Sequence, residues 1–314
     1  MELQYRNLGK SGLKVSAVGL GTNQFGGKVG PEEVKRIIGR ALDLGLNFID
    51  TADTYQSGES ERTIGQAIAG RRDEVVLATK VASKTGPGPN DYGASRRHIM
   101  AGVEASLRRL NTDYIDLYQI HRFDPTTPME ETMRALDDLV RSGKVRYIGA
   151  SNYAAWQLCR SNDIAERWGW SQFVSIQPHY HLLERKIEQE LVPYCTAFGI
   201  GIIPYYPLAG GFLTGKYREG EPAPKGSRGE SNAYVQRYFT PENFATVRKL
   251  QAFAEGRGHT MTELAVAWLL SRPQVATVIC GATSVEQLEA NLKAADWTLS
   301  AEESAEVDEI LDGK

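Results

Sequence analysis

The feature that most constrains this sequence is a repeated alternation of short apolar runs with longer amphipathic stretches. Eight apolar runs of strand length begin at Ala17, Asn47, Val75, Tyr114, Tyr147, Val174, Gly201 and Ala276. Runs that lack polar alternation are typical of parallel strands covered on both faces. Alternation of strands with helices predicts right-handed βαβ units, and eight such units close into a barrel. We therefore predict an α/β fold, a (β/α)8 TIM barrel that residues 1–314 form as one domain.

The stretches between these runs carry helix signals. Behind Pro31, apolar residues recur at helical spacing, at Val34, Ile37, Ile38, Ala41 and Leu42. Thr260 and Glu263 have the spacing of a capping box, in which the two side chains satisfy free N–H groups at a helix start. Thr127, followed by Pro128, predicts a second capping box with proline at the first helical position.

Three irregular segments complete the expected barrel. Polar and apolar residues alternate from Met1 to Leu8, a turn follows, and the chain returns through Leu13 to Val15, which predicts an N-terminal β-hairpin. Long loops are expected at Ser83–Tyr92 and Gly210–Thr240, after the third and seventh strands. Loops of this length inside a compact domain are usually functional, and these two leave the carboxyl ends of strands, the active face of a barrel.

The main alternative is an open, doubly wound sheet. That fold calls for a G-x-G-x-x-G turn after the first strand, with an acidic residue about 20 positions further on. The corresponding segment here is G-L-G-T-N-Q-F-G-G, from Gly19, and its glycines have a different spacing. We therefore favour the barrel.

Composition excludes several classes of function. The 36 Lys and Arg residues against 39 Asp and Glu give a net charge of −3, which predicts no nucleic-acid partner. No apolar run approaches the roughly 18 residues of a membrane span, and the first residues lack the apolar core of a signal peptide. The three cysteines are far apart, as in proteins of a reducing compartment. We expect a cytoplasmic monomer or homo-oligomer without a membrane partner.

Polar side chains close most of the predicted strands, and in a barrel these ends meet at one rim. They are Asp50, Lys80, His121, Ser151 with Asn152, Gln177 and Tyr205. Tyr55 follows Asp50 just beyond the rim. An ammonium group near a tyrosine hydroxyl stabilises the phenolate and so lowers the tyrosine pKa. We therefore predict that Asp50, Tyr55, Lys80 and His121 together deliver a proton to an oxygen that gains negative charge.

Each of these residues alone also has a structural interpretation. Asp50 can cap a turn and His121 can be a satisfied rim histidine, whereas Lys80 is harder to explain because an unpaired buried charge is costly. A metal site is a second possibility, with His179 and His181 joined by Asp50 and His121, since zinc binds such sets. The group as a whole favours proton chemistry and no metal.

Seven motifs, in order along nearly the whole chain, resemble those of the aldo-keto reductases, most closely the bacterial members near the potassium-channel β-subunit branch. The motifs are F-I-D-T-A-D-T-Y (48–55), L-A-T-K (77–80), Y-I-D-L-Y-Q-I-H (114–121), K-V-R-Y-I-G-A-S-N (144–152), S-I-Q-P-H-Y-H (175–181), P-L-A-G-G-F-L-T-G-K-Y (207–217) and V-I-C-G-A-T-S-V-E-Q-L-E-A-N (278–291). The resemblance implies an NADPH-dependent reductase of small aldehydes or ketones. It also implies an alternative, a redox-sensing NADPH-binding subunit of a larger complex with little turnover.

The resemblance further implies roles for individual residues. Asp50, Tyr55, Lys80 and His121 match the family's catalytic tetrad, with Tyr55 as general acid. Ser151, Asn152 and Gln177 would bind the nicotinamide amide, and Tyr205 would stack on its ring. The full set of expected cofactor-binding residues is Gly21, Thr22, Asn23, Asp50, Ser151, Asn152, Gln177, Tyr205, Pro207, Leu208, Gly210, Lys216, Arg228, Gly281, Thr283, Gln287 and Asn291. The expected substrate contacts are Asn23, Phe25, Tyr55, His121 and Arg122.

The adenosine end of the expected cofactor site decides between NADPH and NADH. A 2′-phosphate favours charged donors such as Lys216 and Arg228. Gln287 and Asn291 share one helical face, and the start of that helix adds free N–H groups. The chain departs from the usual family pattern at Tyr206, Cys280, Thr283 and Ala290.

Overall fold

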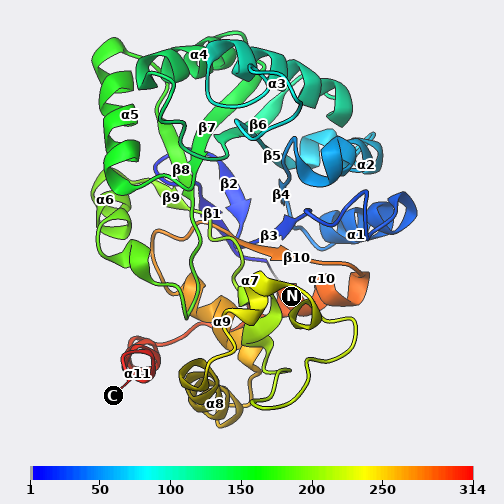
Figure 1. Ribbon diagram of the computed structural model, residues 1–314, viewed down its shortest axis with the longest axis vertical. Helices are drawn as coiled ribbons and strands as arrows, with labels where there is room; N and C mark the ends of the chain where they lie inside the picture. Colours follow the sequence, from blue (N-terminus) through cyan, green and yellow to red (C-terminus); the bar gives the residue numbers. More distant parts are fainter. Residues whose placement is uncertain (1–2, 314) are drawn as a thin grey trace.

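A computed structural model describes residues 3–313, so the part of the predicted first strand at Met1 and Glu2 lies outside the described residues. Eight strands form one sheet in the order β10-β3-β4-β5-β6-β7-β8-β9, and each is parallel to its neighbour (Figure 1). Their bounds are β3 Val18–Gly21, β4 Phe48–Asp50, β5 Val76–Val81, β6 Ile115–Ile120, β7 Val145–Ser151, β8 Phe173–Gln177, β9 Gly201–Ile202 and β10 Val278–Gly281. Each expected strand is present, and the predicted barrel is confirmed.

The sheet closes on itself between β9 and the residues that precede β10. The backbone N–H of Ile202 donates to the carbonyl of Gln274, and the N–H of Ala276 donates back to the carbonyl of Ile202. Inside, Phe48, Leu117 and other apolar side chains form a compact cluster. The interior is thus a packed core, and any cavity must lie at an end of the barrel.

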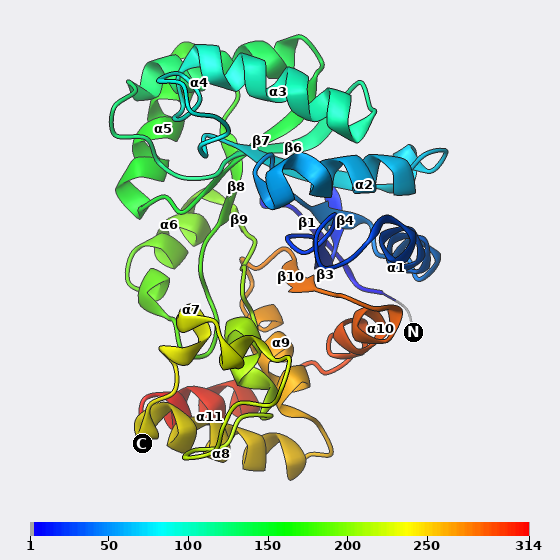
Figure 2. The same ribbon diagram turned by 45° about the vertical axis from the view of Figure 1, so that its right-hand side comes forward.

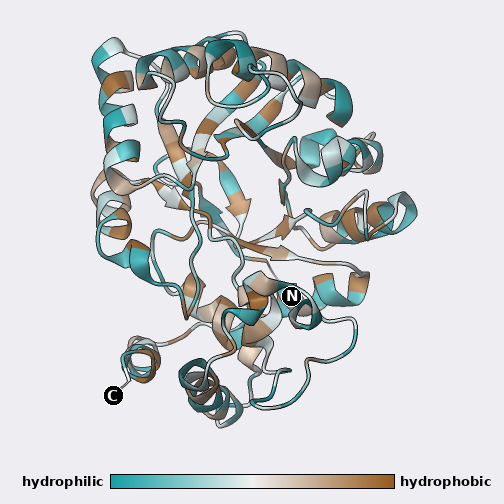
Figure 3. Ribbon diagram, viewed as in Figure 1, coloured by the Kyte–Doolittle hydropathy of each residue, from teal (hydrophilic) through white to brown (hydrophobic). Residues whose placement is uncertain are grey.

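Helices surround the strands, as Figures 1 and 2 both show for α1 to α6. Their bounds are α1 Pro31–Asp43, α2 Glu59–Ala67, α3 Arg96–Leu110, α4 Met129–Arg141, α5 Ala155–Trp168, α6 Leu191–Phe198, α7 Ala233–Gln236, α8 Pro241–Glu255, α9 Met261–Leu270, α10 Val285–Lys293 and α11 Ala301–Leu311. Helix α1 buries the predicted apolar stripe, and Figure 3 shows hydrophobic residues along the strands and on one side of this helix. Among residues 3–313, every helix is too short or too polar to cross a membrane.

The two predicted capping boxes differ in outcome. At the start of α9, Thr260 accepts from the N–H of Glu263 and the Glu263 carboxylate accepts from the N–H of Thr260, as predicted. The prediction at Thr127 is wrong, because α4 begins after Pro128 with no side-chain cap. The Thr127 hydroxyl donates instead to the carboxylate of Asp124, at 2.7 Å, since an ionised carboxylate is a stronger acceptor and lies within reach.

The N-terminal hairpin is confirmed and lies against one end of the barrel. Its strands β1 (Tyr5–Asn7) and β2 (Lys14–Ser16) are antiparallel. Gly9, with φ +59°, turns so close to the barrel that a Cβ there would lie 2.6 Å from the carbonyl oxygen of Gly199. Leu8 and Val15 join the interior cluster and so plug this end. The open end is therefore the one where the parallel strands finish.

The two long loops at that open end are not alike. The segment 83–92 is irregular, as expected. The segment 210–240 is more ordered than predicted, because it contains two short 3₁₀ helices, Ala209–Thr214 and Arg228–Glu230, and helix α7. Its apolar residues, among them Phe212, Leu213 and Tyr238, are buried, and this burial favours ordered structure over an open loop.

Candidate active site

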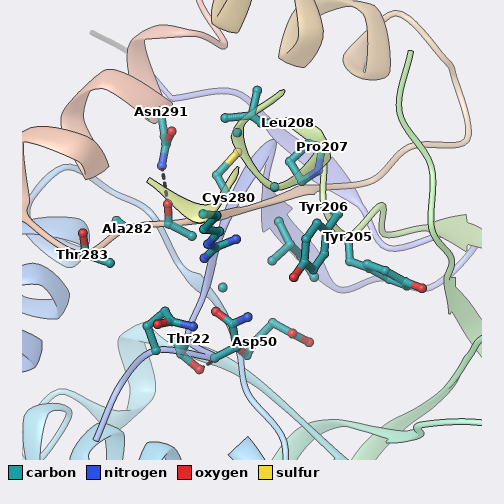
Figure 4. A pocket seen from close by; sticks show the side chains of 18 of the residues that line it. Thr22, Asp50, Tyr205, Tyr206, Pro207, Leu208, Cys280, Ala282, Thr283 and Asn291 are labelled. Carbon is teal, nitrogen blue, oxygen red and sulfur yellow. Dashed lines mark hydrogen bonds between the residues drawn. The ribbon is translucent and has the colours of Figure 1, made fainter. Parts of the chain in front are cut away.

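A cavity of about 880 Å³ lies at the carboxyl ends of the strands (Figure 4). The residues expected to bind cofactor all line it: Gly21, Thr22, Asn23, Asp50, Ser151, Asn152, Gln177, Tyr205, Pro207, Leu208, Gly210, Lys216, Arg228, Gly281, Thr283, Gln287 and Asn291. Tyr55, His121 and Arg122 line it as well. In Figure 4, Asn291 and Asp50 lie at opposite ends of the view, with Cys280 between them. Residues from distant parts of the chain therefore share one elongated cleft.

A buried ion pair lies at the floor of the cleft. Asp50 ends β4 and Lys80 lies on the neighbouring β5; their exposed fractions are 2% and 0%. The Lys80 Nζ donates to Asp50 Oδ2 at 2.6 Å and to the carbonyl of Thr51 at 2.8 Å. Burial alone would lower the pKa of Lys80, but the charges and hydrogen bonds of Asp50 and Tyr55 outweigh it and raise the pKa above its usual value. Lys80 is therefore a fixed positive charge.

Asp50 is held by two amide side chains in addition to Lys80. Its Oδ1 accepts from Gln177 Nε2 at 2.9 Å and from Gln119 Nε2 at 3.2 Å. Gln119 was not predicted from the sequence, because it does not lie at the end of its strand. Gln119 lies within β6, two positions before His121, so the alternation of a strand was the available signal that both point inward.

Tyr55 brings a hydroxyl to this pair. It starts the short 3₁₀ helix Tyr55–Gly58, and Lys80 Nζ lies 3.4 Å from its hydroxyl oxygen. Burial raises the pKa of Tyr55 above its usual value, while the charge of Lys80 acts in the opposite direction. Lys80 thus acts on the pKa of Tyr55 in the predicted direction, but burial raises this pKa by more than Lys80 lowers it. Tyr55 consequently keeps its proton at neutral pH and is able to donate it.

His121 lies beside Tyr55 as a neutral imidazole. The two rings meet edge to face, with centroids 6.0 Å apart. Burial, together with the charges of Lys80 and Arg122, lowers the pKa of His121 to about 3. Its Nδ1 lies 3.2 Å from the hydroxyl of Ser83, a contact that the sequence did not suggest. When Ser83 donates to Nδ1, the proton of His121 is on Nε2, which then serves as a hydrogen-bond donor.

A second polar group lies where β7, β8 and β9 end. The Tyr205 hydroxyl donates to Asn152 Oδ1 at 2.9 Å, and Asn152 Nδ2 donates to the carbonyl of His121 at 3.0 Å. Asn152 has a left-handed backbone, with φ 56°, a strained conformation that clusters at functional sites. The ring of His179 stacks on Tyr205 at 5.2 Å, so one face of this tyrosine is supported from behind.

The far end of the cleft carries donors and acceptors for a polar ligand. Gln287 accepts from both the backbone N–H and the hydroxyl of Thr283, and Asn291 Nδ2 donates to the carbonyl of Gly281. Lys216 and Arg228 line the same end, and within residues 3–313 neither has an acidic partner. This end of the cleft is therefore positively charged.

One expectation is not met. Phe25 does not line the cleft: it is 0% exposed and lies within the main hydrophobic core, where burial of its large apolar ring is favourable. The metal alternative required His179 and His181 to join Asp50 and His121. Instead His181 Nε2 lies 3.0 Å from His179 Nε2 and 3.1 Å from the Tyr238 hydroxyl. In the described part of the chain, no group of three or more His, Cys, Asp or Glu side chains is arranged to hold a metal ion.

Comparison with known proteins agrees with this geometry. The model of the Aldo/keto reductase family matches residues 17–312. A probable voltage-gated potassium channel subunit beta of Arabidopsis thaliana is 41% identical over 302 residues, with 94% of this chain and 92% of the relative covered. L-glyceraldehyde 3-phosphate reductase of Escherichia coli (strain K12) is 36% identical over 326 residues, covering 100% of this chain and 94% of the relative.

An oxidoreductase of Bacillus subtilis (strain 168), YrpG, is 38% identical over 322 residues, with 99% and 97% of the two chains covered. The resemblance inferred from the motifs therefore holds over almost the full length. Together with the closed eight-stranded barrel and the cleft at its carboxyl end, these matches identify the protein's class: it belongs to the aldo/keto reductase family of oxidoreductases.

Proposed function

We propose that this protein reduces aldehydes or ketones to alcohols with NADPH, and that Tyr55 donates the proton. The observation that carries the proposal is the contact of the Tyr55 hydroxyl, 3.4 Å from Lys80 Nζ, above the buried pair of Lys80 and Asp50. A bound nicotinamide would supply the hydride. The proton that completes the alcohol then has to come from the protein, and Tyr55 is a protonated group that lines the cleft.

The neighbouring residues suit this step. When Tyr55 gives up its proton, negative charge develops on its oxygen, and the fixed ammonium of Lys80 stabilises that charge. Asp50 keeps Lys80 charged and oriented. His121, neutral at physiological pH, is able to donate a hydrogen bond to the carbonyl oxygen without a change of its own charge.

The cleft also suits an NADP cofactor. Asn152, Gln177 and Ser151 offer amide and hydroxyl groups for the nicotinamide amide, and the free face of Tyr205 offers a stacking surface. The hydroxyl of Ser227 is buried without a hydrogen-bond partner within the described range, and it lines the cleft next to Arg228. Such a hydroxyl beside an unpaired guanidinium fits a phosphate group.

The substrate end carries Asn23 and Arg122. Arg122 lies close enough to lower the pKa of His121, and it forms no salt bridge among residues 3–313. An unpaired guanidinium at this place favours carbonyl compounds with an anionic group. One relative is named for L-glyceraldehyde 3-phosphate, and this chain would accept a compound of that kind. We expect a lower KM for glyceraldehyde 3-phosphate than for glyceraldehyde itself.

A redox-sensing subunit with little turnover is the second candidate, because another relative is named a potassium channel subunit beta. Turnover separates the two candidates. We further propose that residues 1–314 act as one domain, as a cytoplasmic monomer or homo-oligomer; the three cysteines without disulfides support a reducing compartment.

Steady-state assays of NADPH oxidation with a panel of aldehydes, ketones and sugars test the function. Turnover in the wild-type protein should fall by about 100-fold or more in Tyr55→Phe, which keeps the ring and removes the donor. NADPH affinity should be nearly unchanged. A Tyr55→Phe variant with wild-type turnover would exclude Tyr55 as the donor, and a wild-type protein that binds NADPH without turnover would favour the sensing subunit.

Fluorescence titration with NADPH and NADH tests the cofactor assignment. Loss of one charge-assisted hydrogen bond costs about 1.5–3 kcal/mol, or roughly 10- to 150-fold in affinity. Arg228→Ala should weaken NADPH binding by that amount and leave NADH almost unaffected. Arg218→Ala is the matched control, because Arg218 lies on the same loop and is exposed outside the cleft. Equal losses for both cofactors would show that Arg228 does not contact the 2′-phosphate.

A further inference from the structure

The turn that carries Tyr55 is strained. Residues 51–58 connect β4 to α2, and Gln56, Ser57 and Gly58 have φ of 49°, 56° and 91° in succession. Left-handed conformations are unfavourable for residues other than glycine and persist only where the surroundings hold them. The position of Tyr55 therefore depends on what the turn packs against.

Behind this turn lies a buried group that we term the outer cluster: Asp53, Glu61, Arg109 and Tyr118. Asp53 is 5% exposed, and within residues 3–313 neither of its carboxylate oxygens has a hydrogen-bond partner. Glu61, fully buried, accepts from Arg109 Nε and from the hydroxyl of Thr79, each at 2.6 Å. The buried hydroxyl of Tyr118 also lacks a partner in this part of the chain.

Strands β5 and β6 separate the outer cluster from the residues at the floor of the cleft, and we term this part of the barrel the catalytic wall. Thr79 and Tyr118 alternate with Lys80 and Gln119 along β5 and β6, so they face the helices while Lys80 and Gln119 face the barrel interior. Asp53 lies between Asp50 and Tyr55 in sequence, and its backbone N–H reaches the carbonyl of Lys80 at 3.4 Å. The same short turn thus contacts both sides of the wall.

The outer cluster also contacts the far end of the turn. A Cβ on Gly58 would lie 2.8 Å from Arg109 Cδ, so the backbone there packs directly on the arginine side chain. Arg109 already pairs with Glu61. An ionised Asp53 would add a second buried negative charge, without a well-formed hydrogen bond to its oxygens in the described residues, next to the segment that positions Tyr55.

The charges that face Asp53 come from three elements. Burial and Glu61, on α2, raise the pKa of Asp53 to about 7, while Arg109 on α3, the N–H of Thr54 and Lys80 on β5 lower it by less. Tyr118, on β6, is neutral, because burial, Asp53 and Glu61 raise its pKa well above the usual value. Asp53 is therefore neutral below about pH 7.

We propose that Asp53 is a positioning residue for Tyr55 that acts as a neutral carboxylic acid, and that its ionisation loosens the turn 51–58. This inference rests on the proposed function of Tyr55. Neutral Asp53 fills its site without repelling Glu61, so the strained turn stays packed. Ionised Asp53 is driven toward water, and the hydroxyl of Tyr55 moves from its contact with Lys80.

The first test is the pH profile of turnover with NADPH and an aldehyde. In the wild type, kcat should fall as the pH rises through about 7, the pKa of Asp53, while KM for NADPH stays constant. Asp53→Asn mimics the neutral acid, so this limb should be absent and kcat should keep its low-pH value. A limb that persists unchanged in Asp53→Asn overturns the positioning role.

The second test is thermal melting against pH, which does not depend on activity. Between about pH 4 and 7 the folded wild type holds a proton on Asp53 that the unfolded chain has released, so stability falls as pH rises through this window. Asp53→Asn has no such loss. The melting temperature of Asp53→Asn should be equal to or lower than that of the wild type near pH 4, and it should be higher at pH 8.

Asp124→Asn is the matched control. Asp124 is 4% exposed, and hydrogen bonds from Thr126, Thr127 and the N–H of Ala94 outweigh burial and lower its pKa to about 2. The same Asp-to-Asn change should therefore destabilise the protein at pH 8, and this loss should shrink as the pH falls toward 2.

Melting of both Asp53→Asn and Asp53→Ser at or below the wild-type temperature at pH 8 overturns the proposal. Asp53→Ser is a smaller neutral variant, so it shows whether a low melting temperature of Asp53→Asn comes only from poor packing of the amide. Absence of turnover in the wild type defeats the proposed function and with it the positioning role, whereas the melting series still decides whether Asp53 is protonated. The two failures are thus distinguishable.

Discussion

Asp50 and Asp53 are separated by only two residues, and they are almost equally buried, at 2% and 5% exposure. Asp50 faces the barrel interior and accepts hydrogen bonds from Lys80, Gln119 and Gln177. Asp53 faces the helices, where neither of its carboxylate oxygens has a well-formed hydrogen bond within residues 3–313. The contrast shows that burial alone does not determine the state of an acid: the donors around it do.

The two sides of the catalytic wall also differ in the balance of positive and negative charges. On the inner side one carboxylate faces one ammonium, and neutral amides complete the hydrogen bonds. On the outer side two carboxyl groups share the single guanidinium of Arg109. On the inner side Lys80 keeps its charge, because its pKa is raised above the usual value, whereas the outer side changes its charge near pH 7.

Lys80→Met should remove the difference between Asp50 and Asp53, and it should have the largest effect on the free energy of unfolding. It leaves Asp50 buried without its cation, and breaking a buried pair in this way costs about 3–5 kcal/mol of unfolding free energy. Asp50 then lacks its cation and resembles Asp53. Because a neutral carboxyl avoids the cost of an unpaired buried charge, the lost stability should return as the pH falls. Urea unfolding at several pH values measures both effects.

Arg248→Met serves as the control for that experiment. Arg248 pairs with Glu219 at 2.7 Å, but the two side chains are 59% and 42% exposed. Exposed pairs contribute about 0–1 kcal/mol, so this variant should lose little stability at any pH. A loss in Lys80→Met that is independent of pH would mean that Asp50 stays ionised without Lys80.

The sequence predicted the inner side of the wall much better than the outer side. Asp50, Lys80 and His121 end strands, and strand ends of a barrel converge, so their proximity followed from the fold alone. Gln119 was missed because it lies within its strand. Ser83 was missed because loop geometry does not follow from a periodic pattern.

The outer cluster depends on packing that a single sequence does not specify. Asp53 was not singled out from the sequence, and nothing in its neighbours indicates that its side chain is buried. Glu61 looks like an ordinary charge of a helix start, although it lies three positions before the buried Ile64 and so shares its face. The fold shows the same limit. The alternation of strands and helices predicted the barrel, but it did not indicate that Thr127 would donate to Asp124 instead of capping α4.

Glu61→Gln should reduce the difference between Asp53 and Asp50, with a smaller effect than Lys80→Met. It removes the negative charge next to Asp53 and frees Arg109, so the pKa of Asp53 should fall by about one unit or more. The limb of the kcat profile near pH 7 should move to lower pH by the same amount. Glu59→Gln is the control, because Glu59 lies on the same helix but is exposed. An unmoved limb in Glu61→Gln would exclude Glu61 as the charge that Asp53 faces.

Infrared spectroscopy reports directly on whether Asp53 carries a proton. Between about pH 4, where exposed carboxyl groups ionise, and pH 7, the wild type should show the carbonyl band of a buried protonated carboxyl. This band should be absent from Asp53→Asn and should titrate away in the wild type near pH 7. Persistence of the band in Asp53→Asn, or its absence from the wild type, would contradict a neutral Asp53.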